Sequence, residues 1–336
     1  LWYEHLRSAL LAEGFQASKH DPCLLFKEGM MLICYVDDTG IAAKDPKDID
    51  KLIASLRAKG FELTKEGTFS EFLGIKFETD QETGRIHLSQ KGLIAKIIET
   101  TGMKDCNPNW TPAAQVALDK DEDGEPMQEA WNYPSVVGML LYLTMNTRPD
   151  IQFAVSQVAR FNHNPKRSHA AAVKTIIRYL KRTESMGMYV DPNPDDLHLT
   201  VYCDADFAGL YGRGPERDET TAKSRTGYLV KLGGLPLIWR SQLQTAIALS
   251  TLEAEYQALS DCLRTVIHTK AMLTEVVNGV GVPGDVSASI GCTVFEDNNG
   301  ALLLANQQRV TSRTKYFFVK WHHFWHHIRH GDIKVV

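Results

Sequence analysis

The sequence predicts an α/β protein with three domains. In the first and third domains, short apolar runs of strand length alternate with longer stretches whose apolar residues recur at helical spacing. Between them, three amphipathic stretches follow one another without a strand, which is typical of a small helical unit. The chain has 336 residues, enough for two or three separate cores. The predicted domains are residues 1–105, 106–192 and 193–336.

The composition fits a globular protein and argues against a strongly basic coat protein. Hydrophobic residues make up 43% of the chain, and no apolar run reaches the roughly 20 residues that a membrane helix needs. The formal charge of −4 still allows a nucleic-acid enzyme whose carboxylates gather at metal sites. Six cysteines without a CxxC pair indicate reduced thiols in an intracellular protein. The chain opens inside a helical pattern without Met or a leader, so we expect a piece of a longer protein, without a membrane partner.

The first domain is predicted to contain two hairpins and two helices. The runs CLLF and MMLICYV, joined by the turn KEG, form a hairpin that ends at Asp37 and Asp38. A helix with Asp45 as its N-cap follows and ends at Gly60. The segment FSEFLGIKFETDQETGRIHLSQ forms the second hairpin about the turn ETGR, and the next helix begins at Ser89.

A polar connector and three helices are predicted next. Residues 106–130 contain the acidic run DKDEDGEP, and we interpret them as a solvated connector without a site. Pro149 and Pro165 separate the three helices that follow. The apolar stripes of these helices are Val137, Leu140, Leu141 and Thr144; Ile151, Ala154, Val155 and Val158; and Val173, Ile176, Ile177 and Leu180.

The third domain is predicted to be a mixed sheet with helices. The segments LHLTVYCDADFAG, TGYLVKLGGLPLIWRS and TAIALS supply strands, and CTVFED supplies a central strand. The segment TLEAEYQALSDCLRTVIHTKAML forms a long helix, NGALLLAN a short helix, and a last helix spans residues 319–329.

Acidic residues stand at the ends of elements in this third domain. Asp204 ends its first strand, Glu255 lies in the first turns of the long helix, and Asp297 ends TVFED. One strand-end Asp is more often a turn former, but three carboxylates at the same edge can converge on divalent cations, which prefer oxygen ligands. Two such ions, about 3.5–4 Å apart in known sites, clamp the oxygens of a phosphodiester. Glu253 is the alternative to Glu255, but the two point about 200° apart around a helix, so only one can face the ions.

Many segments, in order along essentially the whole chain, resemble copia-type LTR retrotransposon Pol polyproteins. YCDADFAG, KSRTGYLVKLGG, IALSTLEAEYQAL and EDNNGALLLAN resemble the ribonuclease H domain of that family. MNTRPDIQFAVSQVARF and KTIIRYLKRT are similar to its connection region, and GFQASKHDPCLLF, YVDD, EFLGIKF and IHLSQKGLIAKIIETTGM to the end of its reverse transcriptase palm. The resemblance implies an α+β palm remnant, a helical connection and a ribonuclease H-like mixed sheet with helices.

The resemblance also implies an activity for the third domain. It implies cleavage of the RNA strand of RNA/DNA hybrids, with Mg²⁺ or Mn²⁺ held by Asp204, Glu255 and Asp297. Glu255 is favoured over Glu253 because EYQAL is similar to the Glu-x-x-Ala helix start of ribonucleases H. Asp206 is interpreted as a structural or groove-side residue instead of a ligand, and it is the natural substitute for Asp204.

For the first domain, the resemblance implies part of a polymerase site. Asp37 and Asp38 match the paired aspartates that bind magnesium in an RNA-directed DNA polymerase, whose partner is template-primer nucleic acid. The third aspartate of that site has no match before Asp37. We therefore expect polymerisation only together with other segments of the same polyprotein.

One departure from the family favours a different function. Family members continue the RTK segment with His-Ile-Asp, whose Asp is the fourth metal carboxylate, and this sequence has Phe318 at that place. The alternative is therefore a decayed fragment that binds nucleic acid without catalysis.

Basic residues and histidines supply further candidates. Arg225, Arg313 and Lys315 are the foremost candidates for phosphate contacts, and the others are Arg213, Lys223 and Arg240. Trp239 is interpreted as a core residue. His322, His323, His326 and His327 invite a zinc hypothesis, but no Cys lies near and the Glu of HExxH is missing. Partly packed, partly solvated histidines, able to touch a nucleic-acid backbone when protonated, are the preferred interpretation.

Overall fold

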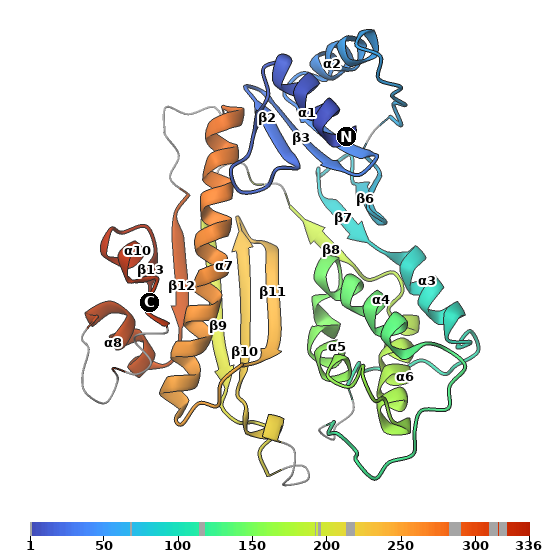
Figure 1. Ribbon diagram of the computed structural model, residues 1–336, viewed down its shortest axis with the longest axis vertical. Helices are drawn as coiled ribbons and strands as arrows, with labels where there is room; N and C mark the ends of the chain where they lie inside the picture. Colours follow the sequence, from blue (N-terminus) through green and yellow to red (C-terminus); the bar gives the residue numbers. More distant parts are fainter. Residues whose placement is uncertain are drawn as a thin grey trace. The chain divides into compact units, whose positions relative to one another are not determined.

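The computed structural model describes residues 2–67, 69–113, 118–191, 193, 196–212, 219–281, 290–308, 315 and 321–336. It contains helices and three sheets, which confirms the predicted α/β class (Figure 1). The chain forms two units, each with a core of its own: unit 1 is Leu1–Leu73 with Arg264–Gly291, and unit 2 is Gly74–Leu263 with Cys292–Val336. No described helix is both long enough and apolar enough to cross a membrane.

Unit 1 is built on an antiparallel sheet in the order β1-β2-β3-β4. Its elements are α1 (Trp2–Ala12), β1 (Gln16–Ala17), β2 (Leu24–Lys27), β3 (Met30–Tyr35), β4 (Asp38–Ala43) and α2 (Pro46–Ala58). Leu10 of α1, Leu32 of β3 and Leu52 of α2 belong to one buried cluster. The predicted first hairpin is confirmed, because β2 pairs with β3 and the two aspartates follow directly.

Helix α2 follows from its local sequence as predicted. Asp45 is the N-cap, and its side chain accepts a hydrogen bond from the Lys47 backbone N at 2.9 Å. Pro46 occupies the first position, where a missing N–H costs nothing. Gly60 lies just beyond the helix with φ of 92°, a conformation that favours glycine.

Helix α7 (Thr251–Val280) is longer than predicted and is divided between the units. In unit 1, Glu275 accepts hydrogen bonds from Ser18 Oγ at 2.6 Å and from the Lys19 backbone N at 3.1 Å. The Val280 carbonyl accepts one from the Gly29 N–H at 2.8 Å. These contacts extend the helix past the end of its predicted segment.

Unit 2 contains a small sheet and a helical core. Its strands β6 (Ile75–Thr79), β7 (Ile86–Ser89) and β8 (Met188–Val190) are antiparallel neighbours, and β5 (Glu71–Phe72) precedes them in sequence. The helices are α3 (Lys91–Thr100), α4 (Tyr133–Asn146), η1 (Pro149–Ile151), α5 (Gln152–Ala159) and α6 (Arg167–Arg182). The three predicted apolar stripes lie in one buried core, with Leu141 only half-buried. Helix α3 begins at Lys91 because Ser89 is the last paired residue of β7.

His169 fixes the start of α6. Its ring is fully buried and stacks on Phe161 with the ring centroids 3.9 Å apart. Its Nδ1 accepts a hydrogen bond from the Lys166 backbone N at 2.9 Å, and its Nε2 donates to the Asp119 carbonyl at 2.7 Å. This pattern requires a neutral imidazole, and burial lowers the pKa of His169 below its ordinary value of 6.5.

We expect acidification to destabilise unit 2 through His169. Because the pKa is lower in the folded state, the unfolded chain binds more protons at this ring once the pH falls below 6.5. The stability that His169 contributes is therefore present above pH 6.5 and is lost as the pH falls through its folded pKa. Urea unfolding of the wild type and of His169→Gln at about pH 7.5 and about pH 5 measures this effect. An equal loss of stability in both proteins would contradict it.

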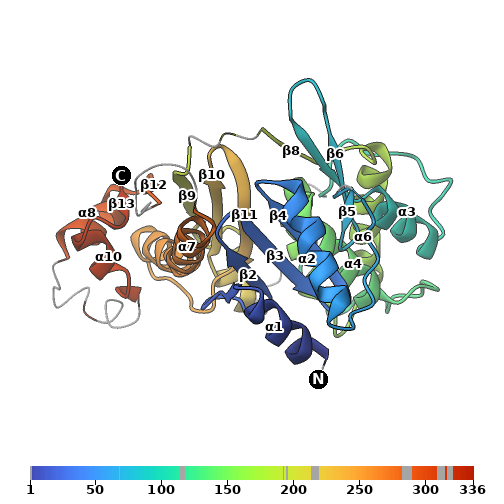
Figure 2. The ribbon, with the colours of Figure 1, turned by 90° about the horizontal axis from the view of Figure 1, so that it is seen from above.

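A mixed sheet carries the candidate site of unit 2. Its strands lie in the order β11-β10-β9-β12-β13, with β12 parallel to both of its neighbours and the other pairs antiparallel. The elements are β9 (Leu199–Asp206), η2 (Glu219–Ala222), β10 (Arg225–Leu232), β11 (Leu235–Leu243), β12 (Cys292–Glu296), α8 (Asn299–Gln307), α10 (Trp325–Arg329) and β13 (Lys334–Val335). Helix α7 lies against one face of this sheet (Figures 1 and 2). Along β9, buried residues such as Val201 and Cys203 alternate with exposed ones such as Asp204, as a half-buried strand requires.

Two expected elements of the third domain are corrected. TAIALS, residues 245–250, is not a strand: β11 ends at Leu243, and Ala248 is buried while Leu249 is 78% exposed. The segment leads into the start of α7 without a partner strand among the described residues. The last helix begins at Trp325 instead of residue 319, since residues 322–324 form no helix, and residues 319 and 320 lie outside the described part. The sequence analysis missed β13, which is too short to show a period.

Candidate metal centre

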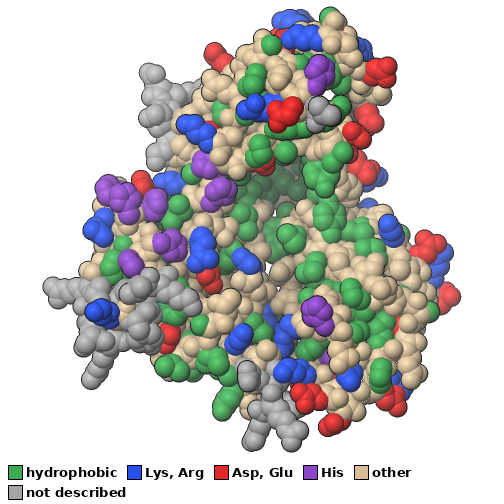
Figure 3. All heavy atoms as spheres, viewed as in Figure 1, with side chains coloured by type: hydrophobic (Ala, Val, Ile, Leu, Met, Phe, Trp, Pro, Cys, Tyr) green, Lys and Arg blue, Asp and Glu red, His purple; other side chains and the backbone are tan. Residues whose placement is uncertain are grey.

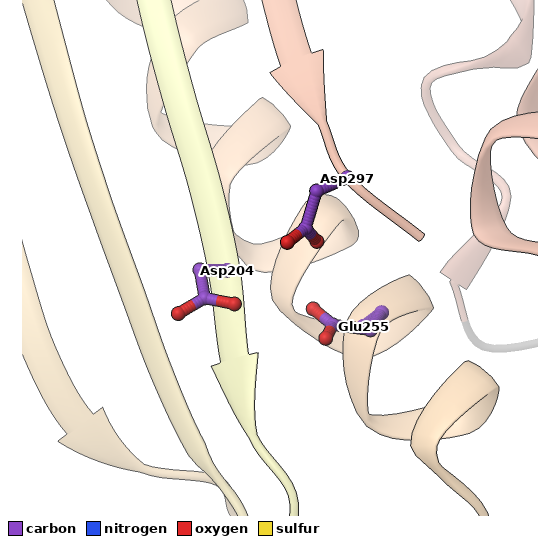
Figure 4. A group of neighbouring side chains, drawn as sticks. All are labelled: Asp204, Glu255 and Asp297. Carbon is purple, nitrogen blue, oxygen red and sulfur yellow. The ribbon is translucent and has the colours of Figure 1, made fainter. Parts of the chain in front are cut away.

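Three elements of unit 2 bring the predicted carboxylates together. Asp204 lies near the end of β9, and Asp297 directly follows β12, whose last paired residue, Glu296, stands beside Cys203. Because β9 and β12 are parallel neighbours, their ends meet at one edge of the sheet. Glu255 projects from an early turn of α7 (Figure 4). One carboxylate oxygen from each residue lies within 4.8 Å of the others.

The structure separates the two glutamates between which the sequence left a choice. The Glu253 carboxylate accepts a hydrogen bond from the Leu249 backbone N at 3.0 Å, and the Glu253 backbone N donates to Ser250 Oγ at 3.2 Å. This arrangement resembles a capping box, in which the glutamate closes the helix start. Glu255 lies in the acidic cluster and Glu253 does not. Whether Glu255 binds metal stays a prediction.

The burial and the charged surroundings of the Glu255 carboxylate suit the binding of a cation. Its side chain is 8% exposed, and burial, followed by the nearby charges of Asp204 and Asp297, raises its pKa to about 7. Its Oε2 is buried without a hydrogen-bond partner. A buried carboxylate oxygen without a donor, beside two more carboxylates, suits a hard divalent ion such as Mg²⁺ or Mn²⁺. Because protons and cations would compete for Glu255, metal affinity is expected to fall as the pH drops below 7.

Glu296 is a fourth acidic residue that the sequence analysis missed. It is 6% exposed, and burial raises its pKa to about 8, so it is largely protonated at neutral pH. Its Oε1 accepts a hydrogen bond from the Asn298 backbone N at 3.2 Å. Side chains alternate along β12, which puts Glu296 on the face opposite Phe295, and this alternation is the sequence pattern from which its burial could have been predicted.

Asp206 stands on the exposed side of β9, as Asp204 does, but outside the group of three. A Cβ added to Gly209 would lie 2.0 Å from its Oδ2, so its carboxylate packs over the turn after β9. The role of Asp206, structural or groove-side, remains a prediction.

Asp37 and Asp38 are exposed at the tip of the β3–β4 hairpin in unit 1. Tyr35 pairs with Asp38, so Val36 and Asp37 form the two-residue turn, and Val36 has φ of 52°. Among the described residues, no third acidic residue joins them within metal-binding distance. The polymerase role of the two aspartates remains a prediction.

The candidate basic residues have different surroundings. Arg225 is 7% exposed: its Nη1 donates to Ser156 Oγ at 2.7 Å, and its guanidinium lies over Phe153, 5.1 Å from the ring centroid. A phosphate could reach this guanidinium only by displacing these contacts. Lys315 is exposed. Arg313, Arg213 and Phe318 lie outside the described residues.

Trp239 is held by a hydrogen bond, and the histidines of α10 contact one another and Asp332. Trp239 Nε1 donates to the Thr144 carbonyl at 2.7 Å, so this ring is held inside unit 2. Histidine side chains gather on the surface over α10 (Figure 3). His326 and His330 lie with ring centroids 4.0 Å apart, and His327 Nδ1 lies 3.3 Å from Asp332 Oδ2. In the described part of the chain, only Asp204, Glu255 and Asp297 bring three ligand atoms this close together.

The fold and the site thus define an α/β protein with an acidic, cation-compatible centre, and comparison with known proteins identifies its family. Residues 1–115 match the family model described as reverse transcriptase (RNA-dependent DNA polymerase). The chain is 34% identical over 332 residues to the Retrovirus-related Pol polyprotein from transposon TNT 1-94 of Nicotiana tabacum, an alignment that covers 96% of this chain and 24% of that protein. It is 30% identical over 339 residues to the Retrovirus-related Pol polyprotein from transposon RE1 of Arabidopsis thaliana, covering 100% of this chain and 22% of that protein.

A shorter relative is covered over most of its length. The chain is 30% identical over 266 residues to a putative transposon Ty5-1 protein of Saccharomyces cerevisiae, covering 78% of this chain and 83% of that protein. The chain therefore belongs to the family of copia-type retrotransposon Pol polyproteins and carries a reverse transcriptase domain. It spans about a quarter of the length of the two plant relatives.

Proposed function

We propose that unit 2 hydrolyses the RNA strand of RNA/DNA hybrids in a metal-dependent reaction, as the ribonuclease H part of a retrotransposon polyprotein. The observation that carries this proposal is the convergence of Asp204, Glu255 and Asp297 from three elements, with one buried Glu255 oxygen left without a donor. The family and the predicted match of these residues to its catalytic carboxylates support the same conclusion.

The carboxylates have distinct parts in this proposal. Asp204, Glu255 and Asp297 would hold Mg²⁺ or Mn²⁺, which supplies Lewis-acid stabilisation and an activated water for phosphodiester cleavage. Asp204 and Asp297 are exposed at the edge of the sheet, where a backbone phosphate can approach. Glu255 is buried on a helix whose start is capped, so its carboxylate is held in place. The 2′-hydroxyls and the shallow minor groove distinguish the RNA strand.

For unit 1 we infer RNA-directed DNA polymerisation only within the longer polyprotein. Residues 1–115 match the reverse transcriptase model, and Asp37 and Asp38 stand exposed at a hairpin tip, as metal-binding residues at a polymerase site would. Among the described residues, no third carboxylate joins Asp37 and Asp38, and two carboxylates are an incomplete ligand set for two magnesium ions. Other segments of the polyprotein would complete it.

The central test is cleavage of a labelled RNA/DNA hybrid. We expect the chain to cleave the RNA strand in Mg²⁺ or Mn²⁺, and Asp204→Asn to lower the rate at least about 100-fold, since it removes a charged ligand that acts on the transition state. Asp105→Asn is the matched control, because Asp105 is exposed and lies outside the cluster. Cleavage that survives Asp204→Asn would overturn the proposed site.

The second candidate function is nucleic-acid binding without catalysis. Phe318, at the place of the fourth carboxylate, is the observation that favours it. Hybrid binding without cleavage in the wild type, with cleavage restored by Phe318→Asp, would assign the loss to this residue. Binding without cleavage in both proteins would support the inactive alternative.

A further inference from the structure

The connector at the start of the second predicted domain lies along a basic helix of that domain. The acidic strap, defined here as residues 119–129, carries six acidic side chains and one lysine, a net charge of −5. Helix α6, against which it lies, carries five basic side chains and no acidic one: Arg167, Lys174, Arg178, Lys181 and Arg182. The two segments are distant in sequence and opposite in charge.

The backbone of the acidic strap is fixed to the start of α6. The Glu125 carbonyl accepts a hydrogen bond from the Arg167 N–H at 2.9 Å, and the Met127 N–H donates to the Pro165 carbonyl at 3.1 Å. Met127 packs against the helical core. These contacts hold the strap in place while its carboxylates remain at the surface.

The carboxylates of the strap pair with the first half of α6. Arg167 Nη1 lies 3.1 Å from Glu125 Oε2, and Lys174 Nζ lies 2.6 Å from Glu129 Oε1. Asp121 accepts a hydrogen bond from the hydroxyl of Ser168 in the first turn of the helix. The Arg167 and Glu125 side chains are 78% and 66% exposed, so this ion pair is weak and open to competition.

Neutral groups contact the second half of α6. Arg178 Nε donates to the Asn107 carbonyl at 2.6 Å, Lys181 Nζ donates to the Cys106 carbonyl at 2.9 Å, and Arg182 lies over the ring of Trp110. Carbonyls and an aromatic ring contact these cations, and no carboxylate of a described residue forms an ion pair with them. The positive charges of Arg178, Lys181 and Arg182 therefore continue the row that begins in the first half of α6, where the strap neutralises the charges.

We propose that this face of α6 binds the phosphate backbone of a nucleic-acid duplex, and that the carboxylates of the acidic strap occupy its first half in place of phosphates. A duplex reaches Arg167 and Lys174 of the wild type only by displacing a carboxylate from each, so most bound duplex leaves both ion pairs intact and the strap backbone stays in place. Replacing a carboxylate by a phosphate at Arg167 or Lys174 gains little free energy, because one ion pair is lost for each one that forms. The strap therefore weakens the binding of a duplex to the wild type. The proposal concerns binding and holds whether or not the acidic cluster cleaves.

The test uses a fluorescent DNA duplex of about 20 base pairs, which a ribonuclease does not cleave, and measures anisotropy at several KCl concentrations. The strap variant Asp121→Asn/Glu125→Gln/Glu129→Gln is expected to bind about 10-fold tighter than the wild type in low salt. Its salt dependence is expected to be steeper by about 0.9 for each phosphate gained, hence by about 2 for Arg167 and Lys174 together. The matched control Glu62→Gln/Glu66→Gln/Glu71→Gln changes the net charge equally in unit 1 and is expected to stay within about twofold of the wild type.

Two further variants make the outcome decisive. Adding Arg167→Gln and Lys174→Gln to the strap variant should return the affinity to about that of the wild type. Glu129→Gln alone releases only Lys174, leaves the backbone contacts intact, and should tighten binding about threefold. A strap variant that binds no tighter than the control, or a gain that persists without Arg167 and Lys174, would overturn the proposal.

Discussion

Glu255→Gln is expected to abolish metal-dependent cleavage of an RNA/DNA hybrid, with a rate at least about 100-fold below that of the wild type. The amide keeps the shape of the side chain but removes the negative charge that makes its buried oxygen a ligand for a hard cation. A loss of about 3 kcal/mol of transition-state stabilisation corresponds to about 100-fold in rate. The measurement is single-turnover cleavage in Mg²⁺, repeated in Mn²⁺.

Glu253→Gln is the matched control two positions away. Glu253 is also buried, at 4% exposed, but its carboxylate accepts a hydrogen bond from the Leu249 backbone N at the helix start and lies outside the group formed by Asp204, Glu255 and Asp297. We expect it to retain cleavage within a few fold and to lose about 1 kcal/mol of stability, as the loss of a helix cap does. If Glu253→Gln abolishes cleavage while Glu255→Gln is active, the helix glutamate of the site has been assigned wrongly.

The positions of Asp204, Glu255 and Asp297 could be predicted because each depends on a local signal. Asp204 and Asp297 end apolar runs, and parallel strands place such ends together. Helix geometry showed only that Glu255 and Glu253 cannot both face the ions, and the choice of Glu255 followed from the similarity of EYQAL to the Glu-x-x-Ala helix start. The hydrogen bonds of Glu253 at the helix start explain why it lies outside the cluster. Their role as metal ligands remains to be tested by the variants above.

Other features depend on contacts between residues that are distant in the sequence, and no local pattern predicts such contacts. Arg225 was a candidate for phosphate contacts, but it is buried, and Ser156 and Phe153, about 70 residues earlier in the chain, contact its guanidinium. The burial of Glu296 depends on which face of β12 is covered. The acidic connector was expected to be solvated, since its own sequence contains no sign of the basic helix to which it is bound.

Arg148→Ala is expected to lower the free energy of unfolding of unit 2 by about 2–3 kcal/mol, because it removes a fully buried guanidinium together with its charge-assisted hydrogen bonds to Asp150. Arg148 is 1% exposed, and its guanidinium binds Asp150 through two hydrogen bonds of 2.9 and 2.7 Å. It also donates to the Thr183 carbonyl at 3.0 Å, which ties the end of α4 to the end of α6. Removing it deletes these hydrogen bonds, although Asp150 still accepts one from Tyr179 Oη at 2.9 Å and the Thr183 carbonyl one from the Met186 N–H at 2.9 Å. Urea unfolding followed by circular dichroism measures the loss.

Arg85→Ala removes an Arg–Asp pair with similar two-point geometry from an exposed site and serves as the control. Arg85 Nε and Nη2 lie 2.6 and 3.0 Å from the two carboxylate oxygens of Asp191, but the side chains are 51% and 66% exposed. Water solvates both groups after the substitution, so we expect no resolvable change in unfolding. Because the two pairs share their chemistry and differ in burial, the difference between the variants isolates the effect of burial. Equal losses in both variants would show that burial does not set the contribution of Arg148.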